Sequence, residues 1–230
     1  IRRGVSSISA CDVPRRAASA SERRMTARFF LFAAGSYFLG SIPTAYLMGR
    51  LLRGIDVRSR GSGNSGATNA LRVLGPGAAL VVLAVDLAKG LVPTLFALRF
   101  LPDAGPTPMT GAAVCAAFAA LGHVFPAFAG FRGGKGVATA AGALVALEPL
   151  LLPACVAVFA PALALSRRAS VASLATAASA PAWYVAISLF RPGGLDPAAL
   201  AFAAAAAALI FWTHRSNVRA LLARREPRLF

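Results

Sequence analysis

Residues 137–165 read VATAAGALVALEPLLLPACVAVFAPALAL, an apolar run of 29 residues whose middle holds Glu148, Pro149 and Pro153. As one helix this run would cross a bilayer once. With a turn near the acid and the two prolines it would cross twice. Each crossing moves every later segment to the other face of the membrane, so the topology of the whole second half of the chain depends on this run.

The composition of the chain is that of a membrane protein. Of its 230 residues 57% are hydrophobic and 14% are charged, and the mean hydropathy is +0.67, values outside the range of ordinary soluble domains. The formal net charge of +16 could suggest nucleic acid binding, but Lys and Arg lie between or beside apolar runs. That distribution is typical of membrane topology, so we expect the lipid bilayer, and no nucleic acid, as a partner.

Charge selects two crossings for residues 137–165. The basic segments at 50–60 and 132–135 mark the cytoplasmic face under the positive-inside rule. One crossing would leave both later basic segments, 167–168 and 214–226, outside, whereas two crossings by short or tilted helices return them to the inside. We therefore predict an all-α integral membrane protein with seven transmembrane helices, a periplasmic (outside) N-terminus and a cytoplasmic C-terminus. The predicted spans are 27–52, 77–100, 111–128, two within 137–165, 169–190 and 197–213.

Two of these spans carry residues that lipid-facing helices avoid. Pro43, after Gly40, interrupts the first span, which indicates either a bend facing a site or a plain structural kink. Asp86 and Lys89 lie at i, i+3 spacing inside the second span. We interpret them as a mutually neutralised pair that braces neighbouring helices near the site.

The first 24 residues differ from the rest of the chain. Residues 1–24 are rich in Arg and Ser and poor in apolar residues, so we expect them to be disordered. The chain begins with Ile, and Met25 directly precedes the first apolar run. We interpret 1–24 as an extension upstream of the native start, with a processed targeting peptide as the alternative. Residues 25–230 would then form one membrane-embedded domain.

A polar, Gly-rich loop lies between the first two spans and reads GSGNSGATNALR at 61–72. We expect its glycines to turn backbone N–H groups toward a bound anion. Arg72 would close the site, because its planar fork matches a phosphate. A flexible linker needs no Asn, Thr and Arg at set offsets, so the loop predicts a phosphate or carboxylate site. Its other candidate residues are Gly61, Ser62, Gly63, Asn64, Ser65, Gly66, Thr68 and Asn69.

A second Gly-rich loop follows the third span and reads GFRGGKG at 130–136. Lys135, flanked by Gly133, Gly134 and Gly136, could approach an anion with its ammonium and its backbone. The loop is not a Walker motif, because Ala129 stands where the first glycine is required and a glycine follows the lysine. His123 is interpreted as a helix-packing residue.

Polar side chains also gather at the inner ends of later spans. Ser166, Ser170 and Ser173 stand near one helix end, and His214, Asn217 and Arg219 follow the last span. Because all these groups converge on one membrane face with the two Gly-rich loops, the sequence predicts an active site there. The cysteines, Cys11, Cys115 and Cys155, suggest neither a disulfide framework nor a metal site, and we expect no cofactor.

The ordered motifs resemble one family, the bacterial acyl-phosphate:glycerol-3-phosphate acyltransferases. They are SIP at 41–43, GSGNSGATNALR at 61–72, DLAKG at 86–90, GHVFPAF and FRGGKGVAT within 122–139, and HRSNVRALL at 214–222. The resemblance implies a multi-pass enzyme of the bacterial inner (plasma) membrane with its active site facing the cytoplasm. It would move a fatty acyl group from acyl phosphate to the 1-hydroxyl of glycerol 3-phosphate. The products would be lysophosphatidic acid and phosphate, in the first step of phospholipid synthesis.

The resemblance also implies site residues. Catalytic roles would belong to Ser62, Arg72, Lys135 and His214. Substrate binding would belong to Gly63, Asn64, Gly66, Thr68, Asn69, Gly133, Gly134, Gly136, Ser170, Ser173 and Asn217, with Ser173 placed before Ser170 as the family's serine. The N-terminal extension and Val218, where Ile is commoner, are the departures from the family pattern.

The chemistry of this reaction suits these residues. Acyl phosphate carries a good leaving group, so positioning and charge can supply the rate without an acyl-enzyme or a metal. His214 is either the general base or a group that only binds substrate. Ser62 as a nucleophile lacks a His–Asp partner in the sequence. A transporter of organic phosphate is the alternative function, and a monomer is expected.

Overall fold

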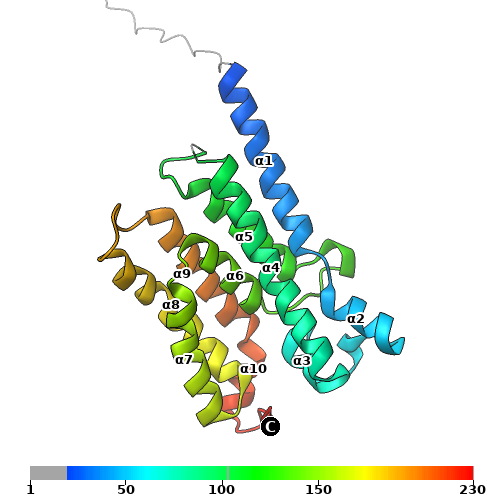
Figure 1. Ribbon diagram of the computed structural model, residues 1–230. Helices are drawn as coiled ribbons and strands as arrows, with labels where there is room; N and C mark the ends of the chain where they lie inside the picture. The colour runs from blue at the N-terminus through cyan, green and yellow to red at the C-terminus, as the bar shows by residue number, and fades with distance from the viewer. Residues whose placement is uncertain (1–19, 103, 230) are drawn as a thin grey trace, which may run out of the picture.

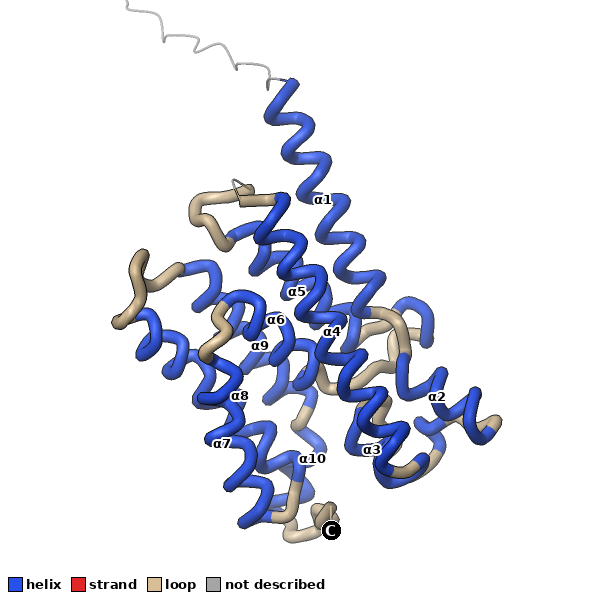
Figure 2. The backbone as a smooth tube through the Cα atoms, viewed as in Figure 1, coloured by secondary structure: helices blue, strands red, loops and turns tan. Residues whose placement is uncertain are grey.

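The computed structural model describes residues 20–102 and 104–229, and within these ranges all regular structure is helical (Figures 1 and 2). The α-helices are α1 (Ala20–Gly40), α2 (Thr44–Arg53), α3 (Ala67–Leu74), α4 (Pro76–Phe100), α5 (Thr110–Val124), α6 (Val137–Leu147), α7 (Leu151–Ser166), α8 (Ala169–Ser188), α9 (Pro197–Thr213) and α10 (Arg215–Leu222). Two short 3₁₀ helices, η1 (Val57–Ser59) and η2 (Ala127–Ala129), lie in the loops.

The first helix begins earlier than the sequence suggested. Residues 20–24 belong to α1, so they are helical and not part of a disordered extension. Ala, Glu, Arg and Met are good helix formers, and they continue the helix N-terminally from its apolar part. The prediction for residues 1–19 lies outside the described residues.

Four helical segments are long and apolar enough to cross a membrane: Arg23–Arg53, Pro76–Phe100, Thr110–Ala129 and Ala169–Ser188. A fifth candidate joins α9 and α10, which are bent by 57° at their junction. The helical content and the apolar spans agree with the predicted class, an all-α membrane protein. Helix length alone supports four or five crossings within the described residues.

The run 137–165 contains two helices, as predicted. α6 ends at Leu147 and α7 begins at Leu151, so the turn falls at Glu148 and Pro149. Pro153 lies in the first turn of α7, where a proline costs no hydrogen bond, and not in the loop. The 11 residues of α6 reach about 16 Å at 1.5 Å per residue, which is short of a 30 Å hydrocarbon core.

The helices pack around α4. This helix contacts α6 most extensively and also packs on α5, α3 and α1, while α7 and α8 form a second pair joined to the bundle through α9. Figure 1 shows α7 and α8 on one flank and α1 on the other. Gly90 allows α4 and α6 to approach closely, because a Cβ at this position would come within 1.9 Å of the Thr139 carbonyl oxygen.

The buried pair Asp86 and Lys89 braces the interrupted first span, as predicted. Lys89 Nζ donates to Asp86 Oδ1 at 2.7 Å and to the carbonyl of Ile42, which lies in the break between α1 and α2. Thr44 donates to the same carboxylate oxygen at 3.2 Å. A carbonyl freed by a helix break needs such a partner inside a membrane. His123 Nδ1 lies 3.7 Å from Asp86 Oδ1 and is buried among these helices.

Candidate active site

The first Gly-rich loop is shaped by the side chain of Asn69. Asn69 is buried in the first turn of α3, and its Oδ1 accepts the N–H of Ser62 at 2.8 Å. Its Nδ2 donates to the carbonyls of Val57, Arg60 and Asn64 at 2.9, 3.1 and 2.9 Å. Since both polar atoms of Asn69 are engaged with the backbone, this residue orders the loop. Gly61 has a φ of +60°, and a Cβ there would come within 2.3 Å of Asn69 Oδ1.

Three of the loop glycines, Gly63, Gly133 and Gly134, do not turn their N–H groups toward an anion, and the prediction is wrong for these three. The N–H of Gly63 donates to the Arg60 carbonyl at 3.1 Å. In the second loop, Gly133 and Gly134 donate to the carbonyls of Val124 and His123 at 3.2 and 3.1 Å. Here glycine permits close packing on the end of α5, because a Cβ on Gly134 would come within 2.1 Å of His123 Nε2. Gly66 and Gly136 are the N-cap residues of α3 and α6.

Lys135 connects the second loop to the C-terminal cluster. Its Nζ donates to Oδ1 of Asn217 in α10, and Asn217 Nδ2 donates to Glu226 Oε1 at 2.7 Å. The hydroxyl of Thr213 donates to the Lys135 carbonyl at 3.0 Å. The structure therefore brings together the two segments that the sequence placed on the same membrane face.

The charge of Lys135 is sensitive to pH. Burial lowers the pKa of its ammonium to about 8, Glu226 acts to raise it, and the charge of Arg72 acts to lower it further. A partly buried ammonium is stabilised when a negatively charged ligand binds beside it, because the ligand offsets the hydration that burial removed.

His214 lies between α9 and α10 with 2% of its surface exposed. Its Nδ1 is 2.8 Å from the carbonyl oxygen of Ile210, so Nδ1 carries the hydrogen and Nε2 is left as an acceptor. Burial, followed by the charge of Lys135, lowers the pKa of His214 to about 4. His214 is therefore a neutral imidazole at pH 7, able to accept a hydrogen bond.

A cavity of about 370 Å³ joins these groups to an apolar wall. Its polar lining residues are Ser62, Asn64, Thr68, Asn69, Arg72, Lys135, Ser170, Ser173, Thr176, His214, Asn217 and Glu226. Its apolar part holds Leu83 and Leu87 of α4, Val137, Ala138 and Ala141 of α6, and Leu152, Cys155, Val156 and Phe159 of α7. The cavity thus offers cationic and polar groups next to a hydrocarbon-like surface.

The serines at the start of α8 differ in their surroundings. Within the part of the chain that the structure describes, Ser170 Oγ is buried and has no hydrogen-bond partner, although it lines the cavity. Ser173, one turn later, also lines the cavity. Ser166 instead donates to the Ala162 carbonyl at 2.6 Å and lies outside the cavity lining. An unpaired buried hydroxyl facing a cavity is suited to a ligand.

Two smaller features complete the site. A neighbouring cavity of about 340 Å³ is lined by Gly63 and Gly133 and shares Ser62, Asn64, Lys135, Asn217 and Glu226 with the first. Gly134 instead lines a space of about 10 Å³ beside His123. Among the described residues, no group of three or more His, Cys, Asp or Glu is placed to hold a metal ion.

Sequence reasoning missed Glu226, a residue of the C-terminal tail whose carboxylate accepts a hydrogen bond from Asn217. The tail is fixed because Arg168 Nε donates to the Glu226 carbonyl at 3.1 Å and the N–H of Leu229 donates to the Arg167 carbonyl at 2.7 Å. Glu226 is the one acid after Asp196 in an Arg-rich segment. That isolated carboxylate was the available signal. Thr176 and the apolar wall from α4 and α7 were also missed.

Comparison with known proteins agrees with this geometry. The family described as "Glycerol-3-phosphate acyltransferase" matches residues 30–224. A glycerol-3-phosphate acyltransferase of Thermosynechococcus vestitus is 43% identical over 204 residues, covering 86% of this chain and 94% of the relative. One of Myxococcus xanthus is 44% identical over 192 residues, covering 84% and 95%.

Solved structures are also similar. The crystal structure of PlsY, an integral membrane glycerol 3-phosphate acyltransferase, in its glycerol 3-phosphate form superposes with a TM-score of 0.79 at 34% identity, covering 87% of this chain and 95% of that one. The lysophosphatidic acid form gives a TM-score of 0.77 at 33% identity over the same shares. Both the sequence match and the fold extend over most of the chain, which is an acyltransferase of the glycerol-3-phosphate acyltransferase family.

Proposed function

We propose that this protein transfers a fatty acyl group from acyl phosphate to the 1-hydroxyl of glycerol 3-phosphate, giving lysophosphatidic acid and phosphate. The observation that carries the proposal is one cavity lined by both cationic and apolar side chains. Arg72, Lys135 and His214 line it together with Leu83 and Phe159. A fatty acyl phosphate has an anionic head and an apolar chain, and glycerol 3-phosphate brings a second phosphate that needs a cationic contact of its own.

Two cationic side chains would hold the phosphates. Arg72 from α3 and Lys135 from the second loop line the same cavity, and their charges influence each other. Ser62, Asn64 and Thr68 would add short hydrogen-bond donors, as would Ser170, Ser173 and Asn217, which line the same cavity. These contacts offset the repulsion between two anionic substrates and the cost of removing them from water. The acyl chain would lie along the wall formed by α4, α6 and α7.

The reaction needs little covalent help from the protein. The glycerol hydroxyl oxygen attacks the acyl carbon, the bond from that carbon to the phosphate oxygen breaks, and its electron pair leaves with inorganic phosphate. Lys135 and Arg72 would stabilise the charge that grows on the phosphate and on the carbonyl oxygen. The hydroxyl proton passes to a substrate phosphate oxygen.

His214 would orient the attacking hydroxyl. Its Nε2 is an acceptor, which suits a hydrogen bond from the glycerol hydroxyl. With a pKa of about 4, its imidazole is too weak a base to take the proton efficiently near pH 7. Binding, and not general base catalysis, is therefore the role that its surroundings favour.

Seven crossings with a cytoplasmic site are proposed for the membrane arrangement. The start of α1 and the C-terminal tail lie at opposite ends of the bundle in Figure 1, as an odd number of crossings requires. α6 and α7 would complete the count as short spans. The placement of the basic loops supports a site that faces the cytoplasm, and the proposal places the protein in the bacterial inner membrane as a monomer.

The test is phosphate release by purified protein in lipid, with palmitoyl phosphate in the presence and absence of glycerol 3-phosphate. Release should depend on glycerol 3-phosphate and be lost in Lys135→Ala and in Arg72→Ala. Arg28→Ala is the matched control, because Arg28 is an exposed arginine of α1. The proposal would be refuted if phosphate release did not depend on glycerol 3-phosphate, or if it were unchanged in both variants.

A further inference from the structure

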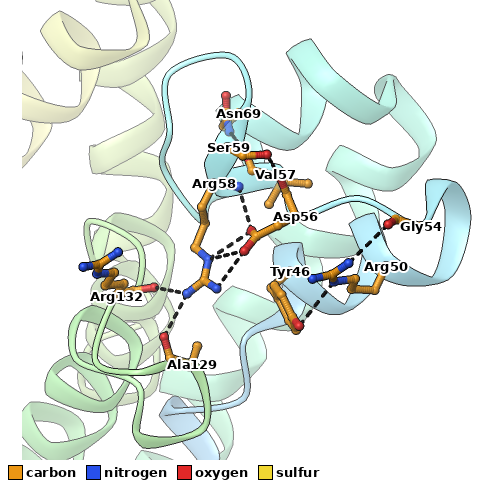
Figure 3. Close-up of polar contacts among 10 residues, drawn as sticks. All are labelled: Tyr46, Arg50, Gly54, Asp56, Val57, Arg58, Ser59, Asn69, Ala129 and Arg132. Atoms are coloured by element: carbon orange, nitrogen blue, oxygen red, sulfur yellow. Dashed lines mark hydrogen bonds and ion pairs between the residues drawn. The ribbon is translucent and has the colours of Figure 1, made fainter.

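Arg58 precedes the first Gly-rich loop in the chain, and its side chain reaches the segment that holds the second loop (Figure 3). Its Nη1 donates to the carbonyl of Ala129 at 2.8 Å and, at 3.4 Å, to the carbonyl of Arg132. These two carbonyls belong to the segment that leads directly to Lys135. Arg58 itself belongs to η1, in the segment that leads into the first loop.

The guanidinium is held from a second side by Asp56. Arg58 Nε lies 3.0 and 3.2 Å from the two carboxylate oxygens, and Nη2 lies 2.8 Å from Oδ2. Asp56 Oδ1 also accepts the backbone N–H of Arg58 at 2.9 Å. The side-chain hydrogen bond lowers the pKa of Asp56 and raises that of Arg58, so the pair stays ionised.

A third contact fixes the plane of the guanidinium. Arg58 Cζ lies 4.9 Å from the centroid of the Tyr46 ring of α2. The carboxylate, the two carbonyls and the ring therefore surround one guanidinium. A lysine could reach one of these partners but could not satisfy the fork and the ring contact together.

The first loop is rigidly connected to Arg58. Asn69 donates to the carbonyls of Val57, the first residue of η1, and of Arg60, its C-cap residue, and it also accepts the N–H of Ser62. A shift of Arg58 relative to Ala129 would therefore move Ser62 relative to Lys135. No atom of Arg58 lines the cavity that holds these two side chains.

We propose that Arg58, oriented by Asp56, is a positioning residue that fixes the distance between the two loops and hence between the two substrate phosphates. The inference rests on the proposed two-phosphate site. Arg58 would act through the two loops, without contacting either substrate directly. Loss of Arg58 should therefore slow the reaction between the two substrates while the binding of glycerol 3-phosphate alone is preserved.

The test compares Arg58→Lys with Arg50→Lys. Arg50 is the matched control, because it also lies over Tyr46, at 5.4 Å, but its hydrogen bonds go to Tyr46 and Gly54 and do not reach the second loop (Figure 3). The full chain in lipid is assayed for kcat with palmitoyl phosphate and glycerol 3-phosphate. Binding of glycerol 3-phosphate alone is measured by calorimetry, and folding by the thermal unfolding midpoint.

Arg58→Lys should lower kcat by a factor on the order of 10², the cost of misplacing reacting groups by about 1 Å. The Kd for glycerol 3-phosphate alone should stay within about threefold of the original value, because its direct contacts remain. Arg50→Lys should leave both quantities near the original values. Asp56→Asn should cause a smaller loss of kcat, about 10-fold, since the carbonyl contacts of Arg58 remain.

Three results would overturn the inference. One is an unchanged kcat in Arg58→Lys, and another is an equal loss in Arg50→Lys. The third is a parallel loss of kcat and of glycerol 3-phosphate binding in a folded variant. If Arg58→Lys fails to fold, Asp56→Asn carries the same comparison of kcat with binding. Lys135→Ala distinguishes the two proposals. If Lys135→Ala is inactive while Arg58→Lys has normal activity, only the positioning role of Arg58 is refuted. If Lys135→Ala is active, the two-phosphate site itself is refuted.

Discussion

Lys135 donates a hydrogen bond to Asn217, which lies 82 residues later in the chain. This contact joins the second Gly-rich loop to the C-terminal helix α10. It also holds the ammonium of Lys135 in a half-buried position beside the cavity. The protonation of one lysine should therefore control substrate binding.

The activity should have a basic limb set by Lys135. Burial lowers the pKa of this group to about 8, so Lys135 is charged below pH 8 and loses its charge as the pH rises through that value. We expect kcat/KM for glycerol 3-phosphate to fall above pH 8. In Lys135→Arg the guanidinium stays charged, so the limb should disappear even if the overall rate is lower. A pH profile with the same limb in both proteins would contradict this assignment.

Replacing Glu226 should move that limb. Glu226 acts to raise the pKa of Lys135, so Glu226→Gln should lower that pKa and shift the basic limb to lower pH. The amide oxygen of Gln can still accept the hydrogen bond from Asn217 Nδ2. Profiles of kcat/KM for the two proteins check the direction, and a limb displaced toward higher pH would argue against it.

His214 should not contribute a titration near pH 6.5. Its pKa of about 4 keeps it neutral through the neutral range, so the profile of His214→Gln should have the same shape as that of the original protein. We expect kcat to fall about 10-fold, less than the roughly 10²–10⁴-fold expected when a general base is lost. The measurement is kcat between pH 5.5 and pH 8 for both proteins, a window chosen to bracket the ordinary histidine pKa of about 6.5. If the original protein has an acid limb near that value and the variant lacks it, His214 would act as the general base and this prediction would be wrong.

Ser170 should matter for substrate binding more than for stability. Its buried Oγ has no partner among the residues described, so Ser170→Ala removes an unsatisfied group and should leave the thermal midpoint unchanged or raised. Loss of one hydrogen bond to substrate should raise KM about fivefold, or ~1 kcal/mol. Ser166→Ala is the control, because Ser166 bonds its own helix. A lower midpoint with normal KM would make Ser170 a structural residue.

Lys89 should be needed for folding and not for chemistry. Lys89→Met leaves the carboxylate of Asp86 buried without its ammonium and the Ile42 carbonyl without its donor. We expect a loss of about 3 kcal/mol in the free energy of unfolding. Asp86→Asn combined with Lys89→Met should recover part of it. Thermal unfolding in lipid checks both variants, and normal stability in Lys89→Met would refute the bracing role.

Local patterns predicted much of the fold. The last span matched α9, Pro197–Thr213, because Asp196 caps its start and Pro197 occupies the first helical position. The turn at Glu148 was predicted because only a second crossing keeps the later basic segments inside. Glu148 is buried there and pairs with Arg191, a partner that sequence alone did not indicate.

The errors arose where loop residues bond to backbone groups of neighbouring turns and helix ends. Gly134 looked like a residue that exposes its N–H to an anion, yet its N–H is bonded to the end of α5. Asn69 looked like a substrate ligand, yet its amide orders the first loop. Both features depend on backbone groups whose relative positions no local pattern specifies. The role of Glu226 depends likewise on the tail folding back to α10.

The fixed tail has a practical consequence for protein engineering. Residues 226–229 are hydrogen-bonded to the turn between α7 and α8, and Glu226 accepts a hydrogen bond from Asn217, which in turn accepts one from Lys135. A purification handle or fluorescent reporter fused after residue 229 would pull on that carboxylate, so its effect would be mistaken for a catalytic defect. Fusions ahead of α1, at the opposite end of the bundle (Figure 1), should leave the enzyme unaltered.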